Sequence, residues 1–214
     1  KKQNSSLIDA VVGVSQFTLN KHLDYGYFQN SKIKTSIFNP VPIPLKIEKT
    51  QSNNIRLGII GLMSKSKGTE FVLERFVKLN QDNIELHLYG KGETIEYESY
   101  LKEKFSNYNN IYFQGFKKVD EIYRNIEIVI ISSLWHEPFP RTLIESMLYR
   151  TLVLATNKGG TGEMICNGNN GYIYSPESKG DFEEKLHLTL KDFKSGKFVF
   201  DSSKFSMDLI CSQY

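Results

Sequence analysis

The sequence predicts an α/β protein built around a doubly wound parallel sheet of the Rossmann-like type. Short apolar runs rich in β-branched residues alternate with stretches whose apolar residues recur every three to four positions. This alternation of strand and helix patterns is typical of parallel sheets with right-handed crossovers. The run IEIVIIS at 126–132 is apolar almost throughout, which indicates a central strand buried on both faces.

Eight runs are predicted as strands, because each is short, apolar and rich in β-branched or aromatic residues. They are AVVGVS, KTSIF, IRLGIIG, IELHLYG, IYFQG, IEIVIIS, TLVLAT and GYIYS. Four stretches between the later strands have apolar residues at i, i+3 and i+4 and are predicted as amphipathic helices. They are TEFVLERFVKLN, TIEYESYLKEKF, VDEIYRNI and TLIESMLYR.

The clearest break along the chain is the segment FNPVPIPLKIEKTQSNN, in which three prolines precede a polar string. Such punctuation is typical of a linker, and we expect a domain boundary near residue 45. Residues 1–45 contain one strand–helix–strand unit, which is too little for a domain. The chain is therefore expected to begin inside one domain and to continue through a second, which we place at 46–200.

Composition narrows the class of protein. With 40% hydrophobic and 13% aromatic residues, a chain of 214 residues can bury a sizeable core. The net charge of +3 is mild and Lys is interleaved with Glu and Asp, so we expect no nucleic acid partner, although weak attraction to an anionic membrane surface is compatible with it. Cys166 and Cys211 have neither metal nor disulfide spacing. No apolar stretch resembles a membrane span or signal peptide, and we expect a cytoplasmic protein.

Two cations precede or open predicted helices, where the partial positive charge of the helix N-terminus disfavours them. Lys67 stands before the helix that follows IRLGIIG, and Arg141 opens the helix in HEPFPRTLIES, directly after Pro140. A third turn on the same sheet edge, NKGGTGE, offers glycine N–H groups to an anion. A single loop cation would be a solvated surface residue, but three such turns on one edge favour a phosphate site.

Glu137 and Glu145 flank the start of the helix that Arg141 opens, eight positions apart. If they had no ligand, Glu137 would be a solvated loop residue, and Glu145 would only contribute favourable negative charge to the first turn of the helix. A carboxylate also accepts two hydroxyl hydrogens from a diol, so the pair suits a sugar ring and a ribose. A phosphate flanked by hydroxyl-rich groups is the description of a nucleotide-sugar.

Other motifs carry less weight. GKGETI at 90–95 lacks the third glycine of a dinucleotide fingerprint and is interpreted as a turn near a base or ribose. The four histidines share no metal spacing, and His87, inside a strand, is expected to be a packed or edge residue. His136 is a candidate for lining the site, and Trp135 for the core or the pocket wall.

Six segments occur in a fixed order, with Glu137 and Glu145 in the fourth: GIIGLMSKSKGTEFVLERF, IELHLYGKGE, NIYFQGF, SLWHEPFPRTLIESM, LVLATNKGGTGEMI and NGYIYSPES. In sequence and spacing they resemble the nucleotide-binding half of retaining GT-B glycosyltransferases of the group 1 family, with its Glu-x7-Glu signature. VVGVSQFTLNKHLDYGYF and IFNPVPI resemble the end of the acceptor-side domain and its linker. KFSMDLICSQY, within 201–214, resembles the start of a terminal helix that crosses back to that domain.

The resemblance implies a role for each matching position. Lys67 contacts the donor diphosphate, and the backbone of Thr142 and Leu143 caps the distal phosphate. Glu137, the candidate catalytic residue, binds hydroxyls of the transferred sugar, and Glu145 binds the ribose. The loops at Gly90 and at Phe116 to Lys117 contact the base. The remaining candidate substrate-binding residues are Gly61, Phe139, Pro140 and Arg141.

Two positions depart from the family pattern. Leu62 stands where many members carry a diphosphate-binding arginine, and Pro140 where many carry a glycine whose N–H faces the sugar. Phosphate binding is therefore expected to depend more on Lys67 and Arg141. One hydrogen bond to the sugar is expected to be absent.

The resemblance implies a retaining hexosyltransferase of which this chain is mainly the donor-binding domain. It implies a UDP- or GDP-sugar donor, a glycan or lipid-linked acceptor, and no metal or other cofactor. Peripheral contact with the inner face of the membrane is compatible with the mild positive charge. By analogy, the enzyme builds a surface polysaccharide or glycolipid. A sugar-nucleotide epimerase of the same build, which needs catalytic acids from the other half, and a non-catalytic nucleotide-binding module are the alternatives. The chain alone is expected to bind a nucleoside diphosphate without transferring sugar.

Overall fold

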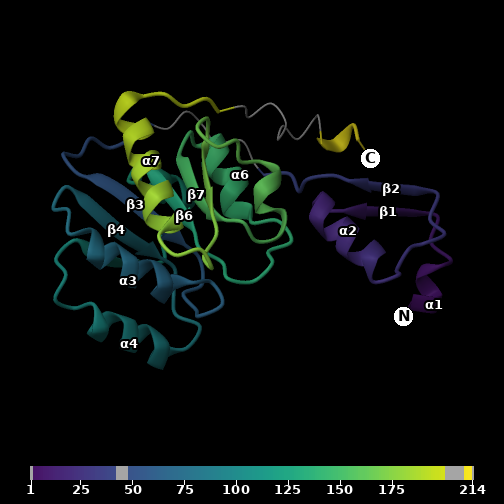
Figure 1. Ribbon diagram of the computed structural model, residues 1–214, viewed down its shortest axis with the longest axis horizontal. Helices are drawn as coiled ribbons and strands as arrows, with labels where there is room; N and C mark the ends of the chain where they lie inside the picture. The colour runs from purple at the N-terminus through teal and green to yellow at the C-terminus, as the bar shows by residue number, and fades with distance from the viewer. Residues whose placement is uncertain (1, 42–47, 201–209, 214) are drawn as a thin grey trace.

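The computed structural model describes residues 2–41, 48–200 and 210–213, which contain two parallel sheets side by side (Figure 1). The larger sheet has six strands in the order β5-β4-β3-β6-β7-β8, and each pair of neighbours is parallel. The smaller sheet and its helices consist of α1 (Lys2–Ser5), β1 (Ala10–Gly13), α2 (Gln16–Asp24) and β2 (Ile33–Ser36). The predicted doubly wound α/β class is confirmed.

All eight predicted strands and all four predicted helices are present. The strands of the larger sheet are β3 (Ile55–Ile60), β4 (Ile84–Tyr89), β5 (Ile111–Gly115), β6 (Ile128–Ile131), β7 (Leu152–Thr156) and β8 (Gly171–Tyr174). The helical segments that alternate with them are α3 (Thr69–Leu79), α4 (Ile95–Lys104), α5 (Val119–Arg124), α6 (Arg141–Leu148), the 3-10 helix η1 (Gly159–Glu163) and α7 (Asp181–Ser195).

Alternate residues of the central strands enter two separate cores, one on each face of the larger sheet. Leu57 and Ile130 pack with α3, α4 and α7 on one face. Val129 and Ile131 pack with α5 and α6 on the other. All four residues of β6 are buried, as expected for a strand covered on both faces.

Among the residues that the structure describes, helix α7 is the one long helix that the sequence pattern does not predict. Its sequence DFEEKLHLTLKDFKS is interspersed with charges and resembles a solvated segment. Phe182, Leu186 and Leu190 recur every four residues and are buried in the core with α3 and α4. Four-residue spacing keeps these side chains on one face of the helix, so a narrow apolar stripe suffices to dock it.

Two expected features fall largely outside the described residues. The boundary near residue 45 lies within 42–47, and most of the predicted terminal segment 201–214 lies within 201–209. Within the ranges that are described, no helix has both the length and the apolar character needed to cross a membrane.

Lys49 anchors the segment before β3 to the amino ends of β6 and β7. Its Nζ donates to the carbonyl oxygens of Tyr123 at 2.8 Å and Ile126 at 2.7 Å, and to Oγ1 of Thr151 at 2.7 Å. An ammonium group has three hydrogens to donate, and all three find acceptors here. Lys49 therefore ties the chain after residue 47 to the segments before β6 and β7.

Replacing Lys49 with Met should destabilise the chain, because it leaves buried carbonyl acceptors without donors. We expect the free energy of unfolding to fall by about 1–3 kcal/mol, measured by urea denaturation. Lys191, exposed on α7, provides the control, and Lys191→Met should have little effect. Equal unfolding midpoints for both variants would show that Lys49 does not anchor this segment.

Candidate active site

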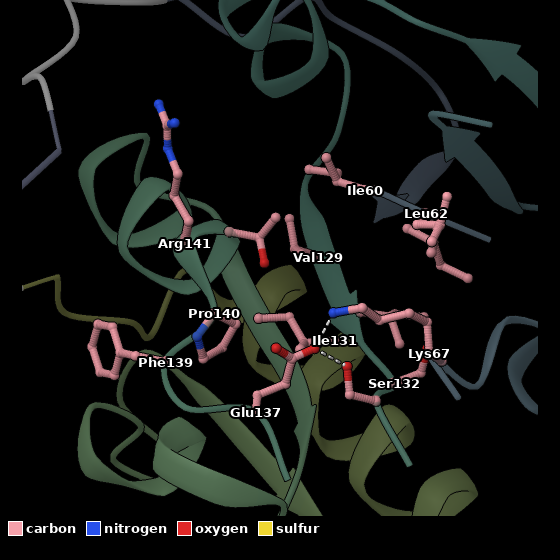
Figure 2. Close-up of a pocket in the computed structure, with 15 residues that line it drawn as sticks. Ile60, Leu62, Lys67, Val129, Ile131, Ser132, Glu137, Phe139, Pro140 and Arg141 are labelled. Atoms are coloured by element: carbon pink, nitrogen blue, oxygen red, sulfur yellow. Dashed lines mark hydrogen bonds and ion pairs between the residues drawn. The ribbon is translucent and has the colours of Figure 1, made fainter. Parts of the chain in front are cut away.

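A cavity of about 250 Å³ opens where the carboxyl ends of β3 and β6 meet the start of α6 (Figure 2). The chain leaves β3 toward β4 and leaves β6 toward β7, in opposite directions along the sheet. In doubly wound sheets, ligands bind in the crevice at such a switch point. The cavity is lined by residues 59–62, Lys67, residues 129–133, Glu137 and residues 139–142.

The structure brings most of the predicted site residues together. Leu143 and Glu145 lie just behind the wall of the cavity, on buried positions of α6. Gly90, Phe116 and Lys117 lie along the same edge of the sheet but do not line this cavity. The predicted residues that do line it are Gly61, Lys67, Glu137, Phe139, Pro140, Arg141 and Thr142.

Glu137 is buried, and one of its two carboxylate oxygens is heavily engaged. Its Oε1 accepts hydrogen bonds from Nζ of Lys67, from Oγ of Ser133 at 2.6 Å and from Nε1 of Trp135 at 3.1 Å. Within the described part of the chain, no group donates to Oε2. The carboxylate is therefore fixed in orientation by three donors and has an oxygen left to accept from a ligand.

Lys67 reaches this carboxylate from the loop between β3 and α3. Figure 2 shows its ammonium group directed at Glu137, and the two form an ion pair. Oγ of Ser132 donates to the Lys67 carbonyl at 2.7 Å. Gly68 has a φ of 67°, and a Cβ there would lie 2.1 Å from the carbonyl oxygen of Ser132. Only glycine lets the loop pass this close to the end of β6.

The N-terminus of α6 forms another wall of the cavity. Pro140 occupies the N-cap and provides no side-chain cap and no N–H. The N–H of Leu143, one of two expected to cap a phosphate, donates instead to the Pro140 carbonyl at 3.0 Å. The N–H of Thr142 has no acceptor among the described residues. At this helix start, Thr142 therefore supplies an open backbone donor.

Arg141 and Glu145 form a second ion pair, one turn apart on α6. Nε of Arg141 lies 2.8 Å from Oε1 of Glu145, and the arginine side chain is 70% exposed while that of the glutamate is 8% exposed. Burial raises the pKa of Glu145, and the neighbouring Arg141 offsets only part of this shift. The guanidinium group extends away from Lys67 and Glu137 (Figure 2), so the two cations do not form one clamp in this structure.

The residues predicted to bind the base, Gly90, Phe116 and Lys117, follow β4 and β5 on the same edge of the sheet as the cavity. The carboxyl ends of β3, β4 and β5 are linked, because Gly61 N–H donates to the Tyr89 carbonyl and Gly90 N–H to the Gly115 carbonyl, both at 2.8 Å. Phe116 follows β5 and is 76% exposed. Lys117 pairs with Glu121 at 3.1 Å. An exposed aromatic ring on this edge of the sheet offers a face on which a base can stack.

Sequence reasoning did not predict that Ser133 and Trp135 orient Glu137. Ser133 follows a buried strand, and a small polar residue at the carboxyl end of a parallel strand is a signal that would have indicated it. Trp135, expected in the core or pocket wall, is 46% exposed and donates to Glu137. His136 does not line the cavity; its ring stacks on Phe17 with centroids 5.3 Å apart.

Known proteins resemble this chain over part of their length. An uncharacterized 42.6 kDa protein from the cps region of Klebsiella pneumoniae is 29% identical over 164 residues, which cover 77% of this chain and 42% of that protein. The chain thus spans about two fifths of the length of this relative. More than half of that relative has no counterpart in this chain.

Two solved structures share its fold. Anabaena HepE in complex with UDP-glucose has a TM-score of 0.73 at 21% identity, with 96% of this chain and 59% of that chain covered. A mutant of TarM from S. aureus, solved with fondaparinux, alpha-GlcNAc-glycerol and UDP, has a TM-score of 0.79 at 21% identity, with 98% and 44% covered. At this identity the likeness establishes the fold alone.

The family described as Glycosyl transferases group 1 matches residues 45–197. The matched region contains the whole larger sheet and every residue that lines the cavity at the switch point. The match extends over more than half of the chain, which therefore belongs to the group 1 family of glycosyl transferases.

Proposed function

We propose that the complete protein transfers a sugar from a nucleotide-diphosphate donor to a glycan or lipid-linked acceptor, and that this chain contains the donor site. One observation carries the proposal. At the switch point, an open helix N-terminus, an ammonium group and a carboxylate with a free oxygen face one cavity. The first two suit a diphosphate and the third suits sugar hydroxyls.

The diphosphate lies against the start of α6 in this proposal. The helix dipole and the Thr142 N–H favour negative charge there, and Lys67 supplies a full positive charge. During transfer, the bond from the anomeric carbon to the phosphate oxygen breaks, and its electron pair leaves with the nucleoside diphosphate. Positive groups fixed in advance stabilise this developing charge.

The sugar lies near Glu137, whose Oε2 accepts its hydroxyl hydrogens. We place Glu137 among the residues that touch the reacting sugar and propose that the acceptor attacks with retention of anomeric configuration, as the family resemblance implies. Pro140 has no N–H to offer the sugar, so sugar recognition depends more on Glu137. The ribose lies near Glu145, and the base contacts Gly90, Phe116 and Lys117, which follow β4 and β5.

A uridine nucleotide is the first choice for the donor, since the two similar structures described above contain UDP or UDP-glucose. A relative encoded in a cps region supports a role in making a surface polysaccharide. We place the reaction in the cytoplasm at the inner face of the membrane, where lipid-linked acceptors are found. The mild positive charge of the chain is compatible with this setting.

A thermal-shift screen of UDP-, GDP- and ADP-sugars on this chain tests the proposal, because a ligand that binds the folded state raises the unfolding temperature by mass action. Stabilisation by none of them would contradict it. Product analysis with the complete protein then separates three outcomes: transfer to an acceptor, an isomerised donor from an epimerase, or neither from a binding module.

The two carboxylates should affect different ligands. Glu145→Ala should weaken binding of the nucleoside diphosphate and of the nucleotide-sugar alike, by about 1.5–3 kcal/mol, because the ribose is common to both. Glu137→Ala should penalise only the sugar-bearing ligand. Isothermal titration calorimetry measures both, and the reverse pattern would exchange the two assignments.

Lys67→Gln should weaken binding of a nucleoside diphosphate by about 1–3 kcal/mol and leave binding of the bare nucleoside nearly unchanged. Dipole repulsion alone predicts that the variant stabilises the empty protein. The ion pair with buried Glu137 predicts the opposite, a lower unfolding midpoint, because the carboxylate loses its partner. Lys65→Gln, at an exposed position of the same loop, is the matched control. Equal penalties for nucleoside and nucleotide would remove the phosphate assignment.

Donor affinity should fall on acidification. Burial holds the pKa of Glu145 above the ordinary value of 4.5, so this carboxylate gains a proton, and ceases to accept from the ribose, at a higher pH than an exposed glutamate would. Calorimetry over a range of pH measures this. The ligand is a nucleotide-sugar, because the terminal phosphate of a free nucleotide itself titrates at about pH 6 and would obscure the titration of Glu145. Glu145→Gln should bind more weakly at neutral pH and show a flatter profile; an unchanged profile would assign the titration to another group.

A further inference from the structure

The N-terminus of α2, in the smaller sheet's unit, is held by a carboxylate from the larger domain. Oε2 of Glu163 accepts the N–H of Gln16 at 2.9 Å, and Oε1 accepts the N–H of Phe17 at 2.7 Å. These are the first two residues of the helix, whose N–H groups have no acceptor within it. The negative charge also interacts favourably with the positive end of the helix dipole.

The same end of α2 contacts the chain on both sides of Glu137. Oγ of Ser15, a fully buried side chain, donates to the Pro138 carbonyl at 2.6 Å. The ring of Phe17 stacks on that of His136. The two sequence neighbours of Glu137, His136 and Pro138, are therefore both held by the start of α2, in the segment 1–45 that is expected to belong to the acceptor-side domain.

The helical turn η1, which contains Glu163, packs against the loop that contains Glu137. The N–H of Gly160 donates to the Glu137 carbonyl at 2.9 Å. Gly159 has a φ of 70°, and a Cβ there would lie 1.8 Å from the same oxygen. The glycines of NKGGTGE thus serve close backbone packing against the Glu137 loop, and η1, this loop and the start of α2 form one packed unit.

We propose that Glu163 is a positioning residue for sugar binding. By holding the start of α2, it keeps Ser15 and Phe17 on the loop and so fixes the backbone from which Glu137 reaches the sugar. The inference rests on the proposed function, in which Glu137 binds the sugar. In the proposed function the phosphate-binding groups belong to α6 and the β3–α3 loop, whereas the hydrogen bonds of the Glu163 carboxylate among the described residues go to α2. Binding of a nucleotide without sugar is therefore expected not to depend on the position of α2.

The first experiment compares two ligands by calorimetry: the nucleotide-sugar that gives the largest thermal shift among UDP-glucose, GDP-mannose and ADP-glucose, and its nucleoside diphosphate. Glu163→Ala should weaken binding of the nucleotide-sugar by about fivefold or more, the usual scale of coupling between sites, and leave that of the nucleoside diphosphate unchanged. Glu163→Gln keeps one carbonyl acceptor and should restore part of the loss. Glu103→Ala, exposed on α4, is the control.

The second experiment follows the helix end itself by amide hydrogen exchange. In Glu163→Ala, the amides of Gln16 and Phe17 should exchange faster, while the amide of Leu19, bonded to the Ser15 carbonyl at 3.1 Å, stays protected because α2 remains folded. Unchanged exchange at Gln16 and Phe17 would overturn the inference.

The outcomes separate the two proposals. If the wild-type chain binds no nucleotide-sugar, the proposed function fails and the inference fails with it. If the wild-type chain binds both ligands, and Glu163→Ala weakens both equally or neither, the inference alone is overturned.

Discussion

β3 and β6 lie side by side, yet the chain leaves their carboxyl ends in opposite directions. The connections that follow these two strands therefore diverge, and the cavity opens at their junction. The loop after β3 brings Lys67 to one side of it, and the loop after β6 brings Glu137 and the start of α6 to the other. The order of the strands thus determines where a ligand can bind, and the side chains on these loops determine which ligand it is.

The two cations that line the cavity are each paired with a carboxylate, Lys67 with Glu137 and Arg141 with Glu145. Pairing keeps either carboxylate from being buried as an uncompensated charge while the cavity is empty. A nucleotide-sugar carries both kinds of partner, since its phosphates attract cations and its hydroxyl groups donate to carboxylates. On the proposed function, binding therefore exchanges partners between protein and ligand, which costs less than desolvating four isolated charges.

Periodicity was enough to predict the strands, most helices and the sheet edge of the site, because apolar spacing reflects burial directly. It could not predict that Lys67 and Glu137 pair, since 70 positions separate them and only the adjacency of β3 and β6 brings them together. The same limit hid Glu163, whose partners Gln16 and Phe17 belong to α2, the helix that connects β1 and β2 of the smaller sheet. Arg141 was correctly identified as unusual at a helix start, but its nearest carboxylate is Glu145, one turn further along its own helix.

The contacts around Glu137 separate two demands on a transferase. On the proposed function, the groups that hold the nucleotide belong to the part of the chain with the larger sheet, whereas the loop that orients the sugar is also held by the start of α2. If the sugar subsite is complete only while α2 is seated, a donor bound in the absence of the acceptor-side segment lacks the geometry for reaction. On this inference, coupling the orientation of the sugar to the position of α2 limits loss of the activated sugar to water, because the reactive arrangement then forms mainly where an acceptor can be present.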